Sequence, residues 1–136
     1  MILFYENTDF KLKNKSLIKD WLEKACEKEN KELGDLSFVF CDNKSFLEKN
    51  IKYLNHNTIS DVITFDYSSK EKISGDIFMN IDCIVMNAQK FNVPFINEFY
   101  RVMIHGVLHL IGYNDKSDVE KIKMREKEDI YLSKIT

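Results

Sequence analysis

The stretch that decides the fold is HGVLHLIGYND, residues 105–115, which holds two of the chain's three histidines within an apolar run. Side chains four positions apart lie on one face of an α-helix, so His105 and His109 can direct their rings toward one point. Gly112 follows where a helix that must stop and reverse needs a residue tolerant of positive φ. Asp115 comes after this turn, and its carboxylate can complete a set of three ligands.

Two imidazoles and one carboxylate predict a metal site of the catalytic kind, because three protein ligands leave a fourth tetrahedral position open. Burying two imidazoles in an apolar helix without partners is costly, which argues against purely structural histidines. For Asp115 alone, the alternative is a solvated turn residue after the helix end. We therefore expect one divalent metal ion per chain, zinc above all, held by His105, His109 and Asp115.

Gly106 bears on the kind of reaction. Metalloproteases of the HExxH type carry their general-base glutamate next to the first histidine, and that position is Gly106 here. Peptide hydrolysis by that route is therefore disfavoured. Phosphodiester cleavage remains, because a metal can neutralise a phosphoryl oxygen and lower the pKa of water toward ~7. A non-haem metal oxygenase also uses two histidines and a carboxylate, but its ligands usually lie on strands of a jelly roll.

Hydrophobic periodicity predicts a sheet covered by helices. Strands are expected at residues 2–6, 36–42, 61–67 and 75–81, and helices at about 15–30, 43–54, 82–91, 95–111 and 117–132. This order predicts an α+β fold, with a mixed sheet of about four strands and about five helices. We expect a single domain over residues 1–136, with a zincin-like metal site on a core helix.

Length, composition and charge limit the number of domains, the kind of RNA contact and the cellular location that we expect. A chain of 136 residues, 44% hydrophobic, fits one domain that buries roughly two-thirds of its unfolded surface. The net charge of −2 gives no global basic footprint, so any RNA contact must be local. The N-terminus lacks the basic start of a signal peptide, and the longest apolar segment is shorter than the ~20 residues that a bilayer needs. We therefore expect a cytoplasmic protein with no membrane partner.

Several further motifs accompany the 105–115 stretch. SDVITFDY is similar to a TDVLSFP-like strand of one family, and GDIFMN is similar to a GDI strand of the same family. NAQKF is similar to that family's NA helix, and KMREKEDIYL is similar to its C-terminal helix. With HGVLHLIGYND, these motifs resemble the YbeY family of bacterial endoribonucleases. The resemblance covers most of the chain from about Asn50 onward.

The resemblance implies a function. Members of the family are single-strand-specific, metal-dependent endoribonucleases that act in ribosomal RNA maturation, at the 3′ end of 16S RNA, and in ribosome quality control. The implied partners are single-stranded rRNA and the small ribosomal subunit or its assembly factors. A ribosome-associated RNA-binding or protein-binding factor with a structural metal is the alternative.

The chain departs from the family pattern in two ways. The family's third ligand is most often histidine, whereas Asp115 stands there, and a site of two histidines and one carboxylate remains competent. The family also usually has an arginine some seven residues before its TDV strand, and IKYLNHNTISDV contains none. We predict that His56 or Arg101 takes over its catalytic role on the phosphate, since Arg101 lies one turn before His105. For Arg101, the alternative is a surface ion pair.

Overall fold

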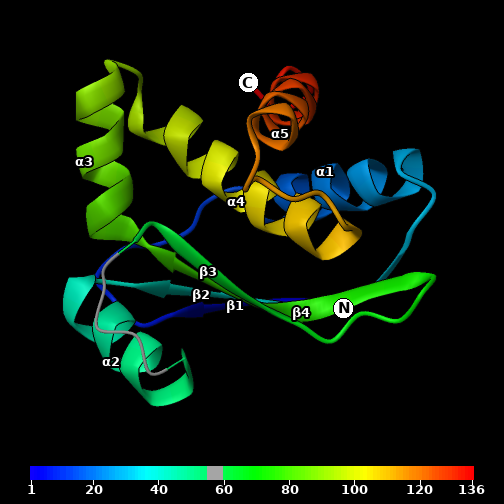
Figure 1. Cartoon of the computed structure of the whole chain (residues 1–136). Coiled ribbons are helices and arrows are strands. Elements are labelled where there is room, and N and C mark those ends of the chain that lie inside the picture. Colours follow the sequence, from blue (N-terminus) through cyan, green and yellow to red (C-terminus); the bar gives the residue numbers. More distant parts are fainter. Residues whose placement is uncertain (55–59) are drawn as a thin grey trace.

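A computed structural model describes residues 1–54 and 60–136, and it consists of a four-stranded sheet with helices on both faces (Figure 1). The elements are β1 (Ile2–Glu6), α1 (Lys15–Lys28), β2 (Glu32–Cys41), α2 (Asn43–Leu54), β3 (Val62–Asp66), β4 (Lys72–Asn80), α3 (Ile81–Phe91), α4 (Phe95–Ile111) and α5 (Asp118–Leu132). The predicted α+β fold with a mixed four-stranded sheet is confirmed.

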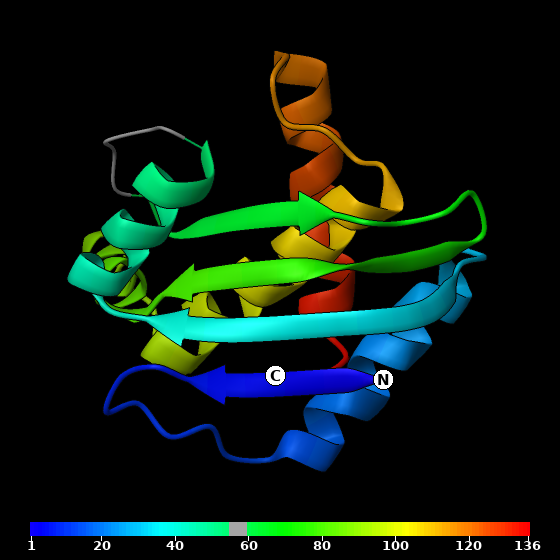
Figure 2. The same ribbon diagram turned by 90° about the horizontal axis from the view of Figure 1, so that it is seen from below.

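The sheet has the strand order β1-β2-β4-β3, which Figure 2 shows from below. Strands β1, β2 and β4 are parallel, and β3 runs antiparallel to β4 with Val62 opposite Met79. Strands β2 and β4 begin earlier than the sequence pattern predicts, because Glu32 pairs with Lys72 and Leu33 with Ile73. Each extension contains a single apolar residue among polar ones, Leu33 in β2 and Ile73 in β4, so the hydrophobic pattern misses it, although backbone hydrogen bonds form there.

Alternating side chains divide the core into two layers. Phe38 and Phe40 of β2 belong to the larger cluster, which includes α1 and α4. Val39 belongs to the smaller cluster on the opposite face of the sheet, together with Phe46 of α2. Figure 1 shows α1, α4 and α5 on one side of the sheet and α2 on the other.

Helix α4 lies close to the sheet because of a glycine. A Cβ atom at Gly106 would lie 2.9 Å from Cγ2 of Ile77 on β4, so a larger side chain would push the helix away. Gly112 ends the helix with φ 127°, as its position predicts, and its N–H donates to the carbonyl oxygens of His109 and Leu108. The chain turns back there toward α5.

A bilayer-spanning segment is not found in the parts of the chain that the structure describes, where every helix is too short or too polar to cross a membrane.

Candidate metal centre and adjoining hollow

Helix α4 and the loop after it bring three donor atoms together. The two Nε2 atoms of His105 and His109 are 3.0 Å apart, and Oδ2 of Asp115 lies 3.3 Å from the first and 3.4 Å from the second. Ligand atoms around a tetrahedral zinc ion are separated by about 3.3 Å, given metal–ligand bonds of about 2.0–2.1 Å. The triangle and its donor chemistry therefore fit one such ion. Among the described residues, these three are the only group of histidine, cysteine and carboxylate side chains close enough to hold a metal.

Glu128 of α5 contacts the ring nitrogen of His105 that faces away from the other two candidate ligands. Nδ1 of His105 lies 2.6 Å from Oε2 of Glu128, whose side chain is almost fully buried. If Nδ1–H donates to this carboxylate, the lone pair of Nε2 points toward His109 and Asp115. Carboxylates that receive the second ring N–H of a ligating histidine fix its tautomer and orientation.

The pKa values of this pair are consistent with an ionised Glu128. Burial by itself lowers the pKa of His105, but the hydrogen bond and charge of Glu128 outweigh it, so the pKa is raised. Burial raises the pKa of Glu128, but its bonds to His105 and Arg101 have the larger combined effect, so the pKa is lowered. The carboxylate therefore stays charged beneath the site and makes the imidazole more basic.

Arg101 lies one turn before His105, as the spacing predicts, and is tied to α5. Its Nη1 donates to Oε1 of Glu128 at 2.8 Å, and its Nη2 donates to Oδ1 of Asp129 at 2.9 Å. These contacts are the ion pair that the sequence left open as an alternative, and the role on the phosphate stays a prediction. His56, the other candidate, lies outside the described residues.

The loop that carries Asp115 is anchored to the end of α1. Tyr113 donates its hydroxyl to Oε1 of Glu29 at 2.5 Å, and Oε2 of the same carboxylate accepts from Tyr131 and, at 3.1 Å, from Nζ of Lys127. Because Tyr113 is two residues before Asp115, this partly buried cluster restrains the position of the third ligand.

The Glu29 cluster gives a pH-dependent contribution to stability. Burial raises the pKa of Glu29, but bonds from Tyr113, Tyr131 and Lys127 outweigh it, so the pKa lies below its ordinary value of 4.5. A lowered pKa stabilises the folded state above pH 4.5, and this contribution is lost as the pH falls through the folded-state pKa. We expect Glu29→Gln to reduce the free energy of unfolding by about 2 kcal/mol at neutral pH. In urea titrations, the difference from the wild type should shrink toward acid pH; a difference independent of pH would contradict an ionised Glu29.

A hollow of about 250 Å³ opens beside His105. It is lined by Asp61, Val62, Asn87, Phe91, Glu98, Arg101, Val102, His105, Arg125 and Glu128. Two of its acids have raised pKa values, because burial disfavours the charged forms of Asp61 and Glu98. The hollow offers room for part of a substrate next to the candidate metal ligands.

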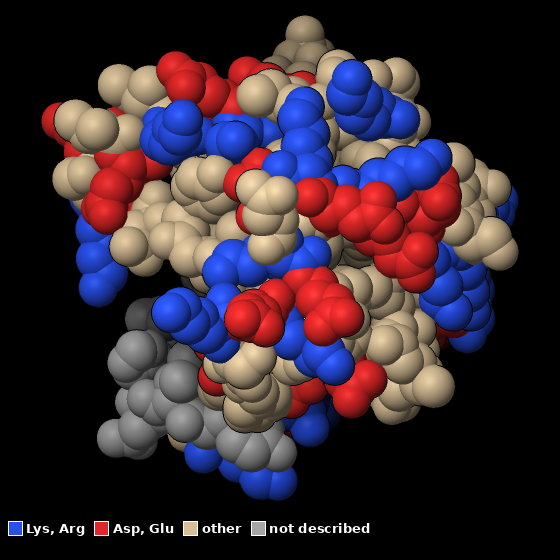
Figure 3. All heavy atoms as spheres, turned by 90° about the vertical axis from the view of Figure 1, so that its right-hand side faces the viewer, with Lys and Arg blue, Asp and Glu red and all other residues tan. Residues whose placement is uncertain are grey.

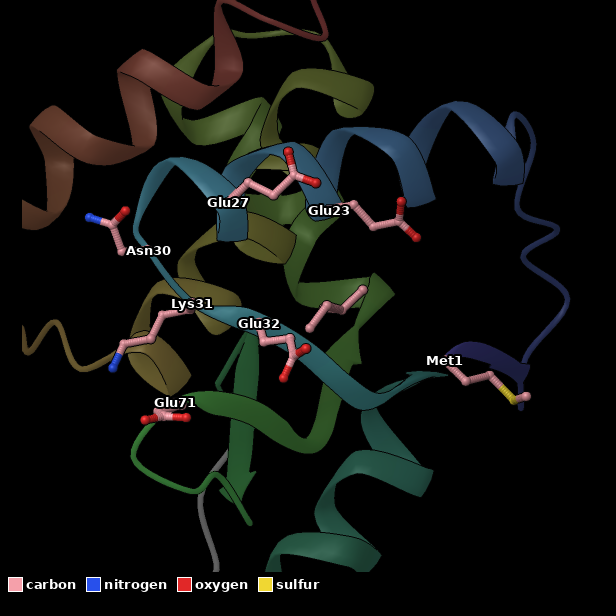
Figure 4. A pocket seen from close by; sticks show the side chains of 8 residues that line it. Met1, Glu23, Glu27, Asn30, Lys31, Glu32 and Glu71 are labelled. Carbon is pink, nitrogen blue, oxygen red and sulfur yellow. The ribbon is translucent and has the colours of Figure 1, made fainter.

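A larger hollow, of about 820 Å³, lies elsewhere and is lined by none of the three candidate ligands. Figure 4 shows that its side chains come from Met1, α1, the following loop, the start of β2 and the segment before β4. Four of them are glutamates, Glu23, Glu27, Glu32 and Glu71, which would repel a phosphate backbone. We therefore place the chemistry at the smaller hollow beside His105.

The surface charge is mixed. On the face in Figure 3, lysines and arginines alternate with aspartates and glutamates and form no extended patch of one sign. This arrangement agrees with the expectation that any RNA contact is local.

No sequence motif marks Glu128, Glu29 or Glu98 as a functional residue. One signal could have found the first of them, since Glu128 shares the buried stripe of α5 with Met124 and Tyr131, four and three residues away. A carboxylate in such a stripe needs a partner.

The chain is similar to known proteins over nearly its whole length. The family model described as "Endoribonuclease YbeY" matches residues 4–136. A relative from Karelsulcia muelleri named endoribonuclease YbeY is 48% identical, covering 97% of this chain and 94% of the relative. One of the same name from Flavobacterium psychrophilum is 46% identical, covering 95% and 92%. The solution structure of a Thermotoga maritima protein matches with a TM-score of 0.72 at 26% identity, covering 99% of this chain and 89% of that one.

Proposed function

The chain belongs to the endoribonuclease YbeY family over residues 4–136, and from this premise we propose that it is a metal-dependent endoribonuclease that cleaves single-stranded ribosomal RNA. The observation that carries the metal dependence is the triangle of donor atoms from His105, His109 and Asp115. We propose these three residues as the ligands of one divalent ion, with zinc favoured by its tetrahedral geometry and by the mixed nitrogen and oxygen donors.

The proposed chemistry divides between the ion and the protein. A bound divalent ion would supply Lewis acidity toward a phosphate oxygen and an attacking water. His105 and His109 would each provide an imidazole nitrogen as ligand, and Glu128, as acceptor of Nδ1–H, would hold His105 in the productive tautomer. Arg101 lines the hollow beside His105 and retains further N–H groups besides the two that Glu128 and Asp129 accept. We therefore keep Arg101, with His56, as the proposed phosphate contacts.

The finer biological assignment is part of the same proposal. We propose maturation of the 3′ end of 16S rRNA and ribosome quality control as the setting, in the cytoplasm, with the small ribosomal subunit or its assembly factors as partners. The whole chain, residues 1–136, would act as one metallo-endoribonuclease domain. An oxygenase of the jelly-roll type is disfavoured, because the histidine pair lies on helix α4 against a mixed sheet.

A cleavage assay tests the proposed activity. The substrate is an end-labelled fragment from the 3′ end of 16S rRNA, offered as a single strand and as a duplex with its complement. We expect the single strand to be cut at internal positions and the duplex to stay intact, with cleavage lost in a chelator. RNA that is bound but never cut would instead support a binding factor with a structural metal.

The third ligand should tolerate exchange for the residue that is commonest in the family. We expect Asp115→His to retain the metal and at least part of the nuclease activity, because an imidazole can fill the same position. A neutral imidazole donates less charge than a carboxylate, so the apparent pKa of the pH–rate profile should fall. Asp115→Ala should lose tight binding, as two imidazoles rarely hold zinc alone.

Metal content and pH–rate profiles of the three variants Asp115→His, Asp115→Ala and Asp115→Asn give the check. An inert, metal-free Asp115→His beside a fully active Asp115→Asn would remove Asp115 from the ligand set.

A further inference from the structure

The hollow beside His105 adjoins a second hollow. The second has a volume of about 340 Å³ and reaches the C-terminal Thr136. Both are lined by Phe91, Glu98, Arg101 and Arg125. Together they extend from a proposed metal ligand to the end of α5, which gives a flexible RNA strand a path beyond the cleavage point.

Glu98 is the unusual residue of this path. Its relative exposure is only 6%, yet no hydrogen bond or ion pair reaches its carboxylate from any residue that the structure describes. Arg101 and Arg125 act on it through their charge alone. Its oxygens are not sealed off, because neither of them is among the described side-chain atoms that are inaccessible and lack a hydrogen-bond partner. A buried acceptor that opens into a hollow and has no donor is suited to an N–H group of a ligand.

Phe91 and nearby cations complete the path. Phe91, the last residue of α3, has a relative exposure of 55% and borders both hollows. Nζ of Lys90 lies 5.7 Å from the centre of its ring, and the Arg125 side chain is largely exposed. Exposed aromatic rings beside cations are the usual means of binding single-stranded nucleic acid, by base stacking and phosphate contact.

We propose that this path holds a nucleobase of the substrate strand, which stacks on Phe91 and donates an amino N–H to Glu98. The proposal rests on the endoribonuclease function above and specifies its substrate preference. Adenine, cytosine and guanine carry an exocyclic amino group, whereas uracil presents carbonyl oxygens beside its one N–H, and these oxygens repel a carboxylate. A second cation at Glu98 is less well supported, since the described residues contain no other group of three ligands around it.

The comparison of cytosine with uracil changes the hydrogen-bonding edge of the base and leaves the stacking area similar. Binding of fluorescent octacytidylate and octauridylate is measured by anisotropy on the full chain, and each RNA is checked for integrity on a gel afterwards. We expect octacytidylate to bind about fivefold more tightly, which corresponds to about 1 kcal/mol. An octamer of 2-pyrimidinone ribonucleoside, which lacks the amino group, should bind no better than octauridylate.

Three variants separate the contributions. Glu98→Gln should bring the ratio close to one, because an amide can both donate and accept. Glu126→Gln is the matched control: it removes the same charge from an exposed position outside both hollows and should leave the ratio unchanged. Phe91→Ala should weaken both octamers about tenfold and preserve the ratio.

Equal affinities of the wild type for the two octamers would overturn the proposal, as would an unchanged ratio in Glu98→Gln. Loss of a second equivalent of divalent metal in Glu98→Gln would also overturn it, in favour of a cation site. The test is independent of cleavage. If the protein distinguished the two octamers but did not cleave RNA, only the proposed nuclease activity would be contradicted. If it cleaved RNA but bound the two octamers equally, only the proposed base pocket would be contradicted.

Discussion

Replacing His109 by alanine is expected to abolish stoichiometric metal binding and to slow RNA cleavage by about 10³-fold, equivalent to the several kcal/mol that a metal contributes as a Lewis acid. His105→Ala should behave in the same way, because the two Nε2 atoms form one edge of the ligand triangle. Metal content by mass spectrometry and cleavage rates of single-stranded RNA measure the two effects.

The remaining histidine provides the control for metal content. His56→Ala should keep one metal ion per chain, since His105, His109 and Asp115 already form a complete set of three protein ligands. If His56→Ala lost the metal while Asp115→Ala kept it, the third ligand would have to be reassigned.

Glu128→Gln is expected to have the second largest effect. Loss of the carboxylate behind a ligating histidine typically lowers metal affinity by about 10-fold to 100-fold. The same change leaves Arg101 without its buried partner, so the free energy of unfolding should fall by about 3 kcal/mol. Competition titrations with a zinc chelator and urea unfolding of the metal-free protein measure the two quantities separately.

Asp129→Asn is the matched control for Glu128→Gln. Asp129 also accepts from Arg101, but its side chain is 60% exposed and no described contact joins it to His105. Its metal affinity should therefore stay within about twofold of the wild type, as for an exposed ion pair. Equal losses of affinity in the two variants would mean that Glu128 acts only by packing α4 against α5.

The fold could be predicted from the sequence because each helix and strand has its own hydrophobic periodicity. The alternation in VITFD and the helical spacing in FINEFYRVMIHGVLHLI indicate β3 and α4 at nearly their observed bounds. The starts of β2 and β4 could not be predicted in this way, since the pairing of Glu32 with Lys72 joins two charged residues that carry no hydrophobic pattern.

The three candidate ligands were within reach of the sequence because they lie within eleven residues of one another, on a helix and the turn after it. The residues that hold these ligands in place could not be predicted from the sequence, because their contacts join segments that are distant along the chain. Glu128 is 23 residues from His105, and Glu29 is 84 residues from Tyr113. Only the packing of α5 against α4 and α1 brings such pairs together. A hydrophobic pattern indicates that a helix face is buried, but it does not indicate which element that face packs against.

Metal reconstitution of the purified chain tests the three-residue site most directly. The protein is stripped with a chelator, zinc is returned in fractions of an equivalent, and the cleavage rate of a single-stranded RNA is followed. Activity should be absent in the stripped protein, rise in proportion to zinc and level off at one equivalent per chain, whereas Asp115→Ala should recover none at that concentration. Full cleavage by the stripped protein, or equal recovery in Asp115→Ala, would contradict a catalytic metal held by His105, His109 and Asp115.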